Sequence, residues 1–371
     1  MRKKITAFVL AICLVAGLAG QTSVYASDVT AKTDSMETAE ERAFDTGYSI
    51  TWSEGAKECW GKVTLEENGI LGVYVTKPVK QITNEMIKIK VSIFDEYGVK
   101  VYEMKDVEET KDGSSYIGLK KGTYYVNLAP EYADSAIGQT SDYKFAFSAS
   151  DKCELEVNDT KETATSAKVG GTYTGYLGSG YLTFDDNRDE EDLYAIKLTK
   201  GQVYKFSWDM PERTTTIVKM LGKNMELDTF SMQSVEAKDF YVAPGTTFIA
   251  PYTGTYYIGV YNYFGGQFKY TFEVTNVTPK ATSISKLKAG SKSFTATWKK
   301  VSYASGYQVQ YSTSKSFKNA KTVKVSSSKT SKTVKSLTAK KKYYVRVRAY
   351  KLVGKTYVYS SWSAAKNVTT K

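Results

Sequence analysis

The chain contains no histidine among its 371 residues. Without imidazole, Ser-His-Asp and Cys-His catalysis are excluded, and so are zinc sites that depend on histidine ligands. Paired carboxylates and lysine remain as catalytic groups in principle, but most common hydrolase mechanisms do not. The composition therefore favours a protein that is not an enzyme.

Cysteine is scarce as well, with three residues in the chain. Cys13 lies in the N-terminal segment that we expect to be removed, so Cys59 and Cys153 remain. In an oxidising compartment these two could form a disulfide, because one lies near the start of the first folded region and the other just past its end. The alternative is two unpaired, half-buried thiols, and the sequence leaves both open.

Long apolar runs are missing after the N-terminus. The apolar run ITAFVLAICLVAGLAG follows Arg2, Lys3 and Lys4 and precedes a small-x-small type cleavage site at Val24-Tyr25-Ala26. This pattern is typical of a secretory signal peptide, over residues 1–26, and the run is short for a membrane span. We expect a secreted, extracellular protein without a transmembrane span after cleavage, which could also associate with the cell wall.

Acidic residues are absent from the C-terminal quarter of the chain. Residues 280–371 contain 20 Lys, 2 Arg and no Asp or Glu, so all 39 acidic residues precede Lys280. Such a domain attracts polyanions, which outside a cell include teichoic acids, anionic glycans and DNA. No base-reading motif is present, so we expect no sequence-specific nucleic-acid binding. The alternatives are that the lysines only keep the domain soluble, or that they contact the acidic part of the same chain or of a neighbour.

The remaining pattern is that of an all-β protein, with abundant Tyr, Val, Thr and Phe and frequent glycine-containing turns. LKKGTYYVNLAP (Leu119 to Pro130) resembles PYTGTYYIGVYN (Pro251 to Asn262), and each is followed by an alternating strand. We therefore predict three tandem β-sandwich domains, the first two of them copies of one domain. The family resemblances described below imply that these two are jelly-roll-like and that the last is immunoglobulin-like. The predicted ranges are a polar leader at 27–47, disordered or forming a short helix, and sandwiches at 48–150, 151–276 and 280–371.

The segment CELEVND (Cys153 to Asp159) carries oxygen-bearing side chains at alternate positions. In a strand, Glu154, Glu156 and Asn158 share one face, while Leu155 and Val157 face a core. A second acidic run, DDNRDEED, spans Asp185 to Asp192. Mixed carboxylate and amide ligands suit calcium. The alternative is a solvated strand edge beside an acidic loop.

The C-terminal region resembles a fibronectin type III domain. The resemblance rests on ATWKKVSYASGYQVQYS with Trp298, and on Leu337 six residues before Tyr343, which Val345 and Val347 follow at period two. It implies that Tyr343 is the corner tyrosine whose hydroxyl bonds back to the backbone. Because Val345 and Val347 are expected to face inward on this strand, alternation places Arg346 and Arg348 on the outer face.

The middle region resembles the bacterial pre-peptidase C-terminal domain, whose relatives include the collagen-binding modules of clostridial collagenases. The matching stretches are ELEVNDT, DEEDLYAIKLTKGQVYKFSW and TGTYYIGVYN, and the first repeat resembles the same fold more weakly, without the acidic segment. The resemblance implies a structural calcium ion. Its ligands would be Glu154, Glu156, Asn158, Asp159, Asp189 and Asp192. Glu190 stands where the family often has Asp, so either Asp189 or Glu190 could serve.

Aromatic residues in a predicted hairpin tip offer a second type of site. Tyr261, Tyr263 and Phe264 occur in YNYFGGQ. If exposed, they could stack on a sugar ring or contact an extended protein ligand. The alternative is that they pack as ordinary strand residues.

Together these features predict a secreted, non-catalytic binding or adhesion protein. Its partner would be an extracellular polysaccharide, a matrix protein or a polyanion such as teichoic acid. The alternative function is an accessory or spacer subunit of a secreted hydrolase, either a protease or a glycosidase.

Overall fold

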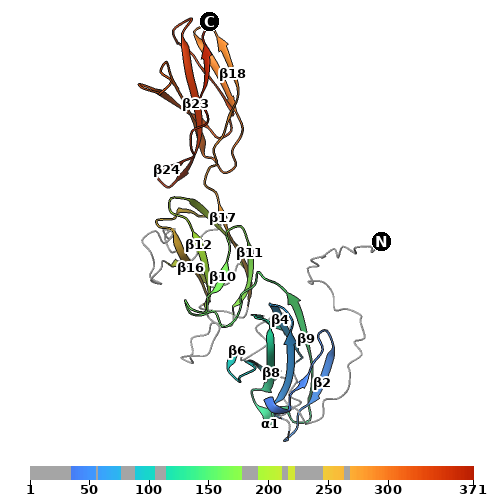
Figure 1. The fold of residues 1–371 in the computed structure, drawn as a ribbon. Coiled ribbons are helices and arrows are strands. Elements are labelled where there is room, and N and C mark those ends of the chain that lie inside the picture. The colour runs from blue at the N-terminus through green and yellow to red at the C-terminus, as the bar shows by residue number, and fades with distance from the viewer. Residues whose placement is uncertain are drawn as a thin grey trace, which may run out of the picture.

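The computed structural model describes residues 35–55, 57–76, 88–104, 114–177, 191–210, 216–221, 245–262 and 268–371. The predicted signal peptide, Asp189, Tyr263 and Phe264 lie outside these residues. Within them the protein is built almost entirely of strands, arranged as three β-sandwiches that follow one another along the chain (Figure 1). The all-β fold class is as predicted. Among the described residues, no helix has the length and apolar character needed to cross a membrane.

The first sandwich consists of two sheets with strand orders β1-β3-β8-β5-β6 and β2-β9-β4-β7. Alternate residues of these strands point inward and form one apolar cluster between the sheets. In β3, for example, buried residues alternate with half-buried ones. The elements are η1 (Met36–Thr38), β1 (Glu40–Glu41), β2 (Gly47–Thr51), β3 (Cys59–Leu65), β4 (Gly69–Val75), β5 (Ile89–Asp95), β6 (Lys100–Met104), β7 (Ser114–Leu119), β8 (Gly122–Pro130), α1 (Ala133–Ala136) and β9 (Thr140–Ala149).

The second sandwich repeats this arrangement with sheets β10-β12-β16-β14 and β11-β17-β13-β15. The short first strand pairs parallel to its neighbour in both sandwiches, β1 with β3 and β10 with β12. The two copies thus share one strand order, and among the described residues of the second copy no strand corresponds to β6. The elements are β10 (Thr165–Ala167), β11 (Thr172–Leu177), β12 (Glu191–Leu198), β13 (Val203–Asp209), β14 (Thr216–Leu221), β15 (Thr247–Ile249), β16 (Gly254–Asn262) and β17 (Phe268–Asn276).

The third sandwich packs sheet β18-β19-β22 against sheet β21-β20-β23-β24, with β25 also paired to β23. Trp298 lies in the core on the second strand, and the backbone N–H of Thr338 donates to the Tyr343 hydroxyl at 3.2 Å. The corner tyrosine is therefore where the resemblance placed it. The strands are β18 (Ile284–Gly290), β19 (Ser293–Trp298), β20 (Gly306–Ser312), β21 (Lys321–Ser326), β22 (Ser331–Val334), β23 (Lys342–Val353), β24 (Thr356–Tyr359) and β25 (Lys366–Thr369).

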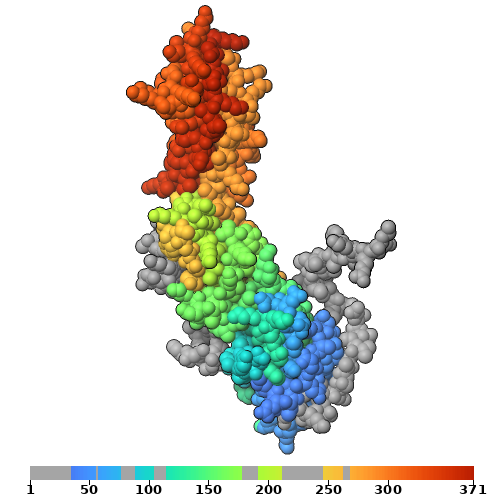
Figure 2. All heavy atoms as spheres, viewed as in Figure 1, coloured from blue at the N-terminus to red at the C-terminus, as the bar shows by residue number. Residues whose placement is uncertain are grey.

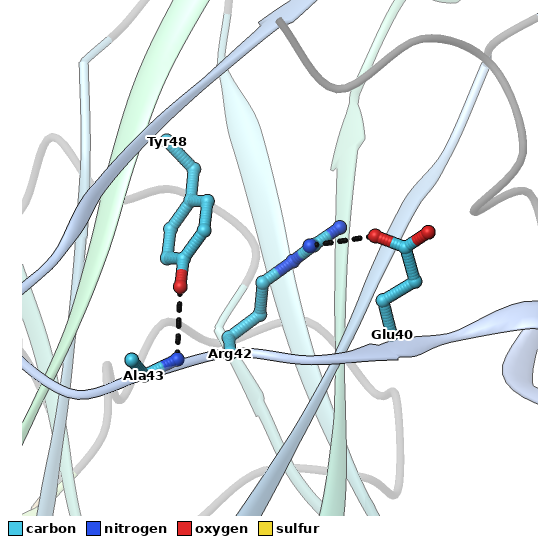
Figure 3. A network of polar contacts seen from close by, with 4 residues as sticks. All are labelled: Glu40, Arg42, Ala43 and Tyr48. Atoms are coloured by element: carbon cyan, nitrogen blue, oxygen red, sulfur yellow. Dashed lines mark hydrogen bonds and ion pairs between the residues drawn. The ribbon is translucent and has the colours of Figure 1, made fainter. Parts of the chain in front are cut away.

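The described part of the polar leader predicted at 27–47 contains the short 3-10 helix η1, one of the two forms expected, but the segment also joins the first sandwich. Residues 40–41 form β1, and the side chain of Arg42 is buried in the first sandwich. Figure 3 shows its guanidinium bonded to Glu40 at 2.9 Å, with the Tyr48 hydroxyl accepting a bond of 2.8 Å from the Ala43 N–H. The segment was misread because few of its residues are apolar, whereas the buried side chain that anchors it is an arginine with a long aliphatic stem.

Candidate metal centre and cationic domain

The acidic segment lies at the junction of the first two sandwiches. Cys153 forms an isolated parallel β-bridge with Thr174 on β11, and Glu156 forms another with Leu119 on β7. Backbone hydrogen bonds join both sides, since Glu154 N–H donates to the Thr174 carbonyl at 2.9 Å and Glu156 N–H donates to the Gly118 carbonyl at 2.8 Å. The segment therefore contacts both domains through its backbone.

The alternation of the segment is real, but its two faces are exchanged relative to the prediction. Glu154, Glu156 and Asn158 are buried, whereas Leu155 and Val157 are only half-buried. This face is covered from both sides, by Gly118 of the first sandwich and by Tyr176 and Asp192 of the second. Sequence alternation identified the two faces, and the positions of the two sandwiches decided which one became the interior.

The structure brings Asp192 of β12 to the same place. Glu154, Glu156 and Asp192 each offer an oxygen, and these oxygens lie within 4.8 Å of one another. The Asn158 amide donates to Asp192 Oδ1 at 3.0 Å, and its carbonyl oxygen accepts the Leu193 N–H at 3.2 Å. Four of the six predicted ligands are thus gathered in one buried cluster. Asp159 is exposed, and Asp189 lies outside the described residues.

Backbone and tyrosine donors fix the carboxylates. Glu154 accepts the Gly118 N–H at 3.0 Å and the Tyr176 N–H at 2.5 Å, and Asp192 accepts a hydrogen bond from the Tyr270 hydroxyl. Burial raises the pKa of the Asp192 carboxyl to about 6, although the bonds from Tyr270 and Asn158 act in the opposite direction. A positive charge or a shared proton is needed to hold such a cluster together.

Two glycines make room for the cluster. A Cβ at Gly118 would lie 2.0 Å from the Glu154 carbonyl oxygen, and a Cβ at Gly175 would lie 2.2 Å from the Tyr270 hydroxyl and 2.5 Å from Glu154 Oε2. Any other residue at these positions would displace a member of the cluster. The sequence alone indicated neither these glycines nor Tyr270, because all three are distant from the acidic segment along the chain.

The other two predicted features are arranged as follows. Tyr261 lies within β16, paired with Glu191 and Ile217, and its ring covers Gly259, so it is a half-buried strand residue and not part of a hairpin tip. No disulfide joins Cys59 to Cys153. Both thiols are buried, one in the core of the first sandwich and the other at the junction, and burial raises the pKa of Cys153 to about 11.

The C-terminal sandwich exposes nearly all of its positive charge. Of its 22 cationic residues, only Lys332, Lys351, Arg346 and Arg348 are half-buried, and the others are exposed. Figure 2 shows this domain as a lobe that the other two sandwiches leave largely uncovered. Residues 280–371 hold no Asp or Glu, so no carboxylate side chain of the domain offsets this charge.

Comparison with known proteins identifies this domain alone. A fibronectin type III model matches residues 269–366, which begins inside β17 of the second sandwich and so starts earlier than the predicted boundary at 280. No curated protein matches the chain.

Solved structures similar to this chain include fibronectin type III proteins. The fn3 domain of human contactin 1 is 21% identical, with 25% of this chain and 77% of that one covered at a TM-score of 0.22. An Fn3-like protein from Clostridium thermocellum is 21% identical, with 25% and 95% covered at a TM-score of 0.21. A structure described as a myokine is 21% identical, with 25% and 95% covered at a TM-score of 0.20.

The molecule is thus a tandem β-sandwich protein with a C-terminal fibronectin type III domain. Domains of this type generally serve as non-catalytic binding or spacer modules. Fold alone does not specify a ligand, so the ligand has to be argued from the surface of this chain.

Proposed function

We propose that this protein is a secreted, non-catalytic binding protein whose fibronectin type III domain engages an anionic polymer of the cell envelope or extracellular matrix. The observation that supports this most strongly is the exposed cationic surface of residues 280–371, which no carboxylate side chain of that domain neutralises. A surface of one sign concentrates an oppositely charged polymer around it, and the attraction weakens with salt. The two preceding sandwiches would then hold the binding domain away from the N-terminus.

We also propose that the junction cluster binds calcium. Its donors are all oxygens, three of them from carboxylates that are buried together, and calcium accepts such irregular oxygen sets. Glu154, Glu156 and Asp192 would hold the ion, and Asn158 orients Asp192. The ion supplies positive charge that offsets the repulsion between the carboxylates. Its role would be structural, because the cluster carries no group placed to act on a substrate. The same cluster supports the proposal that the second sandwich is a pre-peptidase C-terminal domain.

The binding proposal is tested by mixing the mature chain, residues 27–371, with isolated cell walls and with soluble polyanions at low and at high salt. We expect binding at low salt that falls steeply as salt increases. The quadruple variant K321Q/K329Q/K335Q/K340Q removes four exposed charges and should weaken binding to every polyanion. A chain that binds none of them at low salt would instead support a spacer or accessory role.

The calcium proposal is tested by calorimetry and thermal unfolding of the same chain with added calcium. We expect heat of binding and a rise in Tm for the wild type, and neither for Glu156→Gln, which removes a carboxylate charge with little change in volume. Glu162→Gln is the matched control, because Glu162 is exposed in the loop that follows the same segment. Equal behaviour of wild type and both variants would refute the site.

A further inference from the structure

The outer face of the sheet β21-β20-β23-β24 carries two arginines on its central strand. β23 alternates, so that Val345 and Val347 are fully buried, while Arg346 and Arg348 point to the opposite face. These are the only arginines in 280–371. Their neighbours across β20 are glutamines, since Gln310 pairs with Arg346 and Gln308 pairs with Arg348. The next strand adds Lys324 beside Gln308, so one row of this face reads Lys, Gln, Arg.

A tryptophan is held between the two arginines. The segment after β24 is fixed along β23 by serine hydroxyls, with the Ala349 N–H donating to Ser360 Oγ and the Val347 N–H donating to Ser363 Oγ, both at 3.0 Å. This places the ring of Trp362 4.6 Å from the Arg346 guanidinium carbon and 4.3 Å from that of Arg348. The ring therefore contacts both cations.

Each guanidinium is also held on two further sides. Phe317 lies 4.1 Å from Arg346, and Tyr359 lies 3.7 Å from Arg348, so each guanidinium contacts two aromatic rings. The Arg346 Nε–H donates to Gln310 at 2.8 Å, and the Arg348 Nε–H donates to Gln308 at 2.9 Å. Stacking and the hydrogen bond from Nε fix the plane of each guanidinium fork before any ligand binds. This lowers the conformational entropy lost on binding.

The two terminal nitrogens of each fork have no carboxylate within the domain to bind, because residues 280–371 contain none in their side chains. A guanidinium binds carboxylate or phosphate through two parallel hydrogen bonds. Lys324, which pairs with Gln308 and lies 4.1 Å from the Tyr357 ring, extends the positive charge along the same face. The face is thus organised for a ligand with successive anionic groups.

Spacing distinguishes between the available polyanions. Arg346 and Arg348 are two residues apart on one strand, which places their backbones about 7 Å apart. The guanidinium carbons lie 4.6 and 4.3 Å from the Trp362 ring centre, so they are at most 4.6 + 4.3 = 8.9 Å apart. This range includes the backbone spacing, which corresponds to six backbone bonds of an extended peptide. A polymer of glycerol phosphate or a sugar-phosphate strand also has six bonds from one phosphorus to the next. In a polysaccharide of uronic acids, each charge instead belongs to a separate ring, and the rings set a different repeat.

We propose that Arg346 and Arg348 bind two consecutive phosphates of a flexible phosphodiester polymer with a six-bond repeat. This inference rests on the proposed function, and it names the ligand class and the residues that recognise it. The aromatic rings of the face are covered by the cations, so they are not available for stacking on bases. Recognition is therefore of the backbone, and a glycerol phosphate polymer and single-stranded DNA share the required chemistry.

The experiment measures binding of the mature chain to three probes with equal numbers of charges. These are a short glycerol phosphate polymer, an oligothymidylate and an oligogalacturonate. We expect the variant R346K/R348K, which keeps both charges but loses the forks and the stacking, to lose about tenfold in affinity for the two phosphate polymers. K329Q/K335Q, which removes two exposed charges elsewhere on the domain, should lose less than R346K/R348K. Both variants are checked for an unchanged Tm.

The outcomes separate this inference from the proposed function. If R346K/R348K binds as tightly as the wild type, or if the galacturonate binds as well as the phosphate polymers, the ligand class proposed here is wrong while polyanion binding stands. If the wild type binds no probe at low salt, the proposed function itself is wrong. Tighter binding of one phosphate polymer than the other identifies the natural source, with the shared recognition confirmed. Because lysine could disturb packing around Trp362, R346Q/R348Q serves as a second variant and should show a loss at least as large.

Discussion

The first two sandwiches have the same strand order, yet opposite charges are buried at the same place. Strand register aligns Leu65 with Leu198, because each pairs with the glycine that begins the Gly-Thr-Tyr-Tyr strand. Cys59 then occupies the position of Asp192 in the second sandwich. The first copy buries a cation near this point, and the second copy buries three carboxylates.

The difference in buried charge between the two copies depends on a large and a small residue that trade places between neighbouring strands. Arg42 in the first copy corresponds to Ala167, and Gly61 corresponds to Tyr194. A Cβ at Gly61 would lie 3.1 Å from Arg42 Cγ, so the arginine stem fills space that the tyrosine ring fills in the second copy. The strand arrangement is the same in both copies because the total side-chain volume at the two positions is conserved, although the buried charge differs.

The largest effect is expected at Gly175. The equivalent residue of the first sandwich is Ile50, so the backbone there accepts a side chain, but in the second copy the space belongs to Tyr270 and Glu154. Gly175→Ala should lower the free energy of unfolding by about 3 kcal/mol and weaken calcium binding. Gly55→Ala, where a Cβ meets nothing within 4 Å, is the control. Denaturant unfolding measures both variants. Equal unfolding curves would contradict the claim that Gly175 makes room for Tyr270 and Glu154.

The next effect concerns the swapped pair. Arg42→Ala removes a buried side chain and should cost about 2 kcal/mol, and Gly61→Tyr alone should destabilise by overpacking against Phe145. The double variant R42A/G61Y copies the second sandwich and should be more stable than the sum of the two single losses, by about 1–3 kcal/mol. If the losses of unfolding free energy are additive in a double-mutant cycle, the two side chains do not fill the same space.

A smaller effect is expected from pH in the absence of calcium. The folded-state pKa of Asp192 is raised, so the folded chain holds the proton more tightly than the unfolded chain does. Its contribution to stability is complete below the ordinary carboxyl pKa and is lost as pH rises through about 6.

Thermal unfolding in EDTA across this pH range measures that loss. Asp192→Asn should flatten it, while Asp151→Asn, at an exposed position, should not. Calcium should restore stability above pH 6, because the ion then takes the place of the proton. A pH dependence that is identical in Asp192→Asn would assign it to other groups.

The smallest effect is expected at Tyr143. Register aligns it with Phe272, and its buried hydroxyl lies beside Cys59 and Arg42 without a hydrogen bond of good geometry. Tyr143→Phe should therefore change the free energy of unfolding by no more than about 1 kcal/mol. Chemical denaturation of the variant beside the wild type measures the change. A large loss would show that this hydroxyl supports the buried Arg42.

Much of the fold could be predicted from alternation and from the repeated Gly-Thr-Tyr-Tyr strand, because both are local. The site was only partly predictable. Glu154, Glu156 and Asn158 belong to one pattern, but whether that pattern faces water depends on a neighbouring domain. Sequence similarity of YKFAF and FKYTF would align Phe145 with Tyr270, whereas strand register places Ser141 at the Tyr270 position. The partner of Asp192 was therefore hidden until the strands were paired.

The junction segment also has a consequence for solubility. β7 and β11 are the outermost strands of their sheets, and the backbone of residues 153–156 contacts one on each side. Unpaired edge strands are templates for aggregation and strand exchange between chains. One short segment thus protects two edges at once, and separating the domains would expose both together. The buried carboxylates control this protection. If their mutual repulsion displaces the segment, both edge strands become exposed.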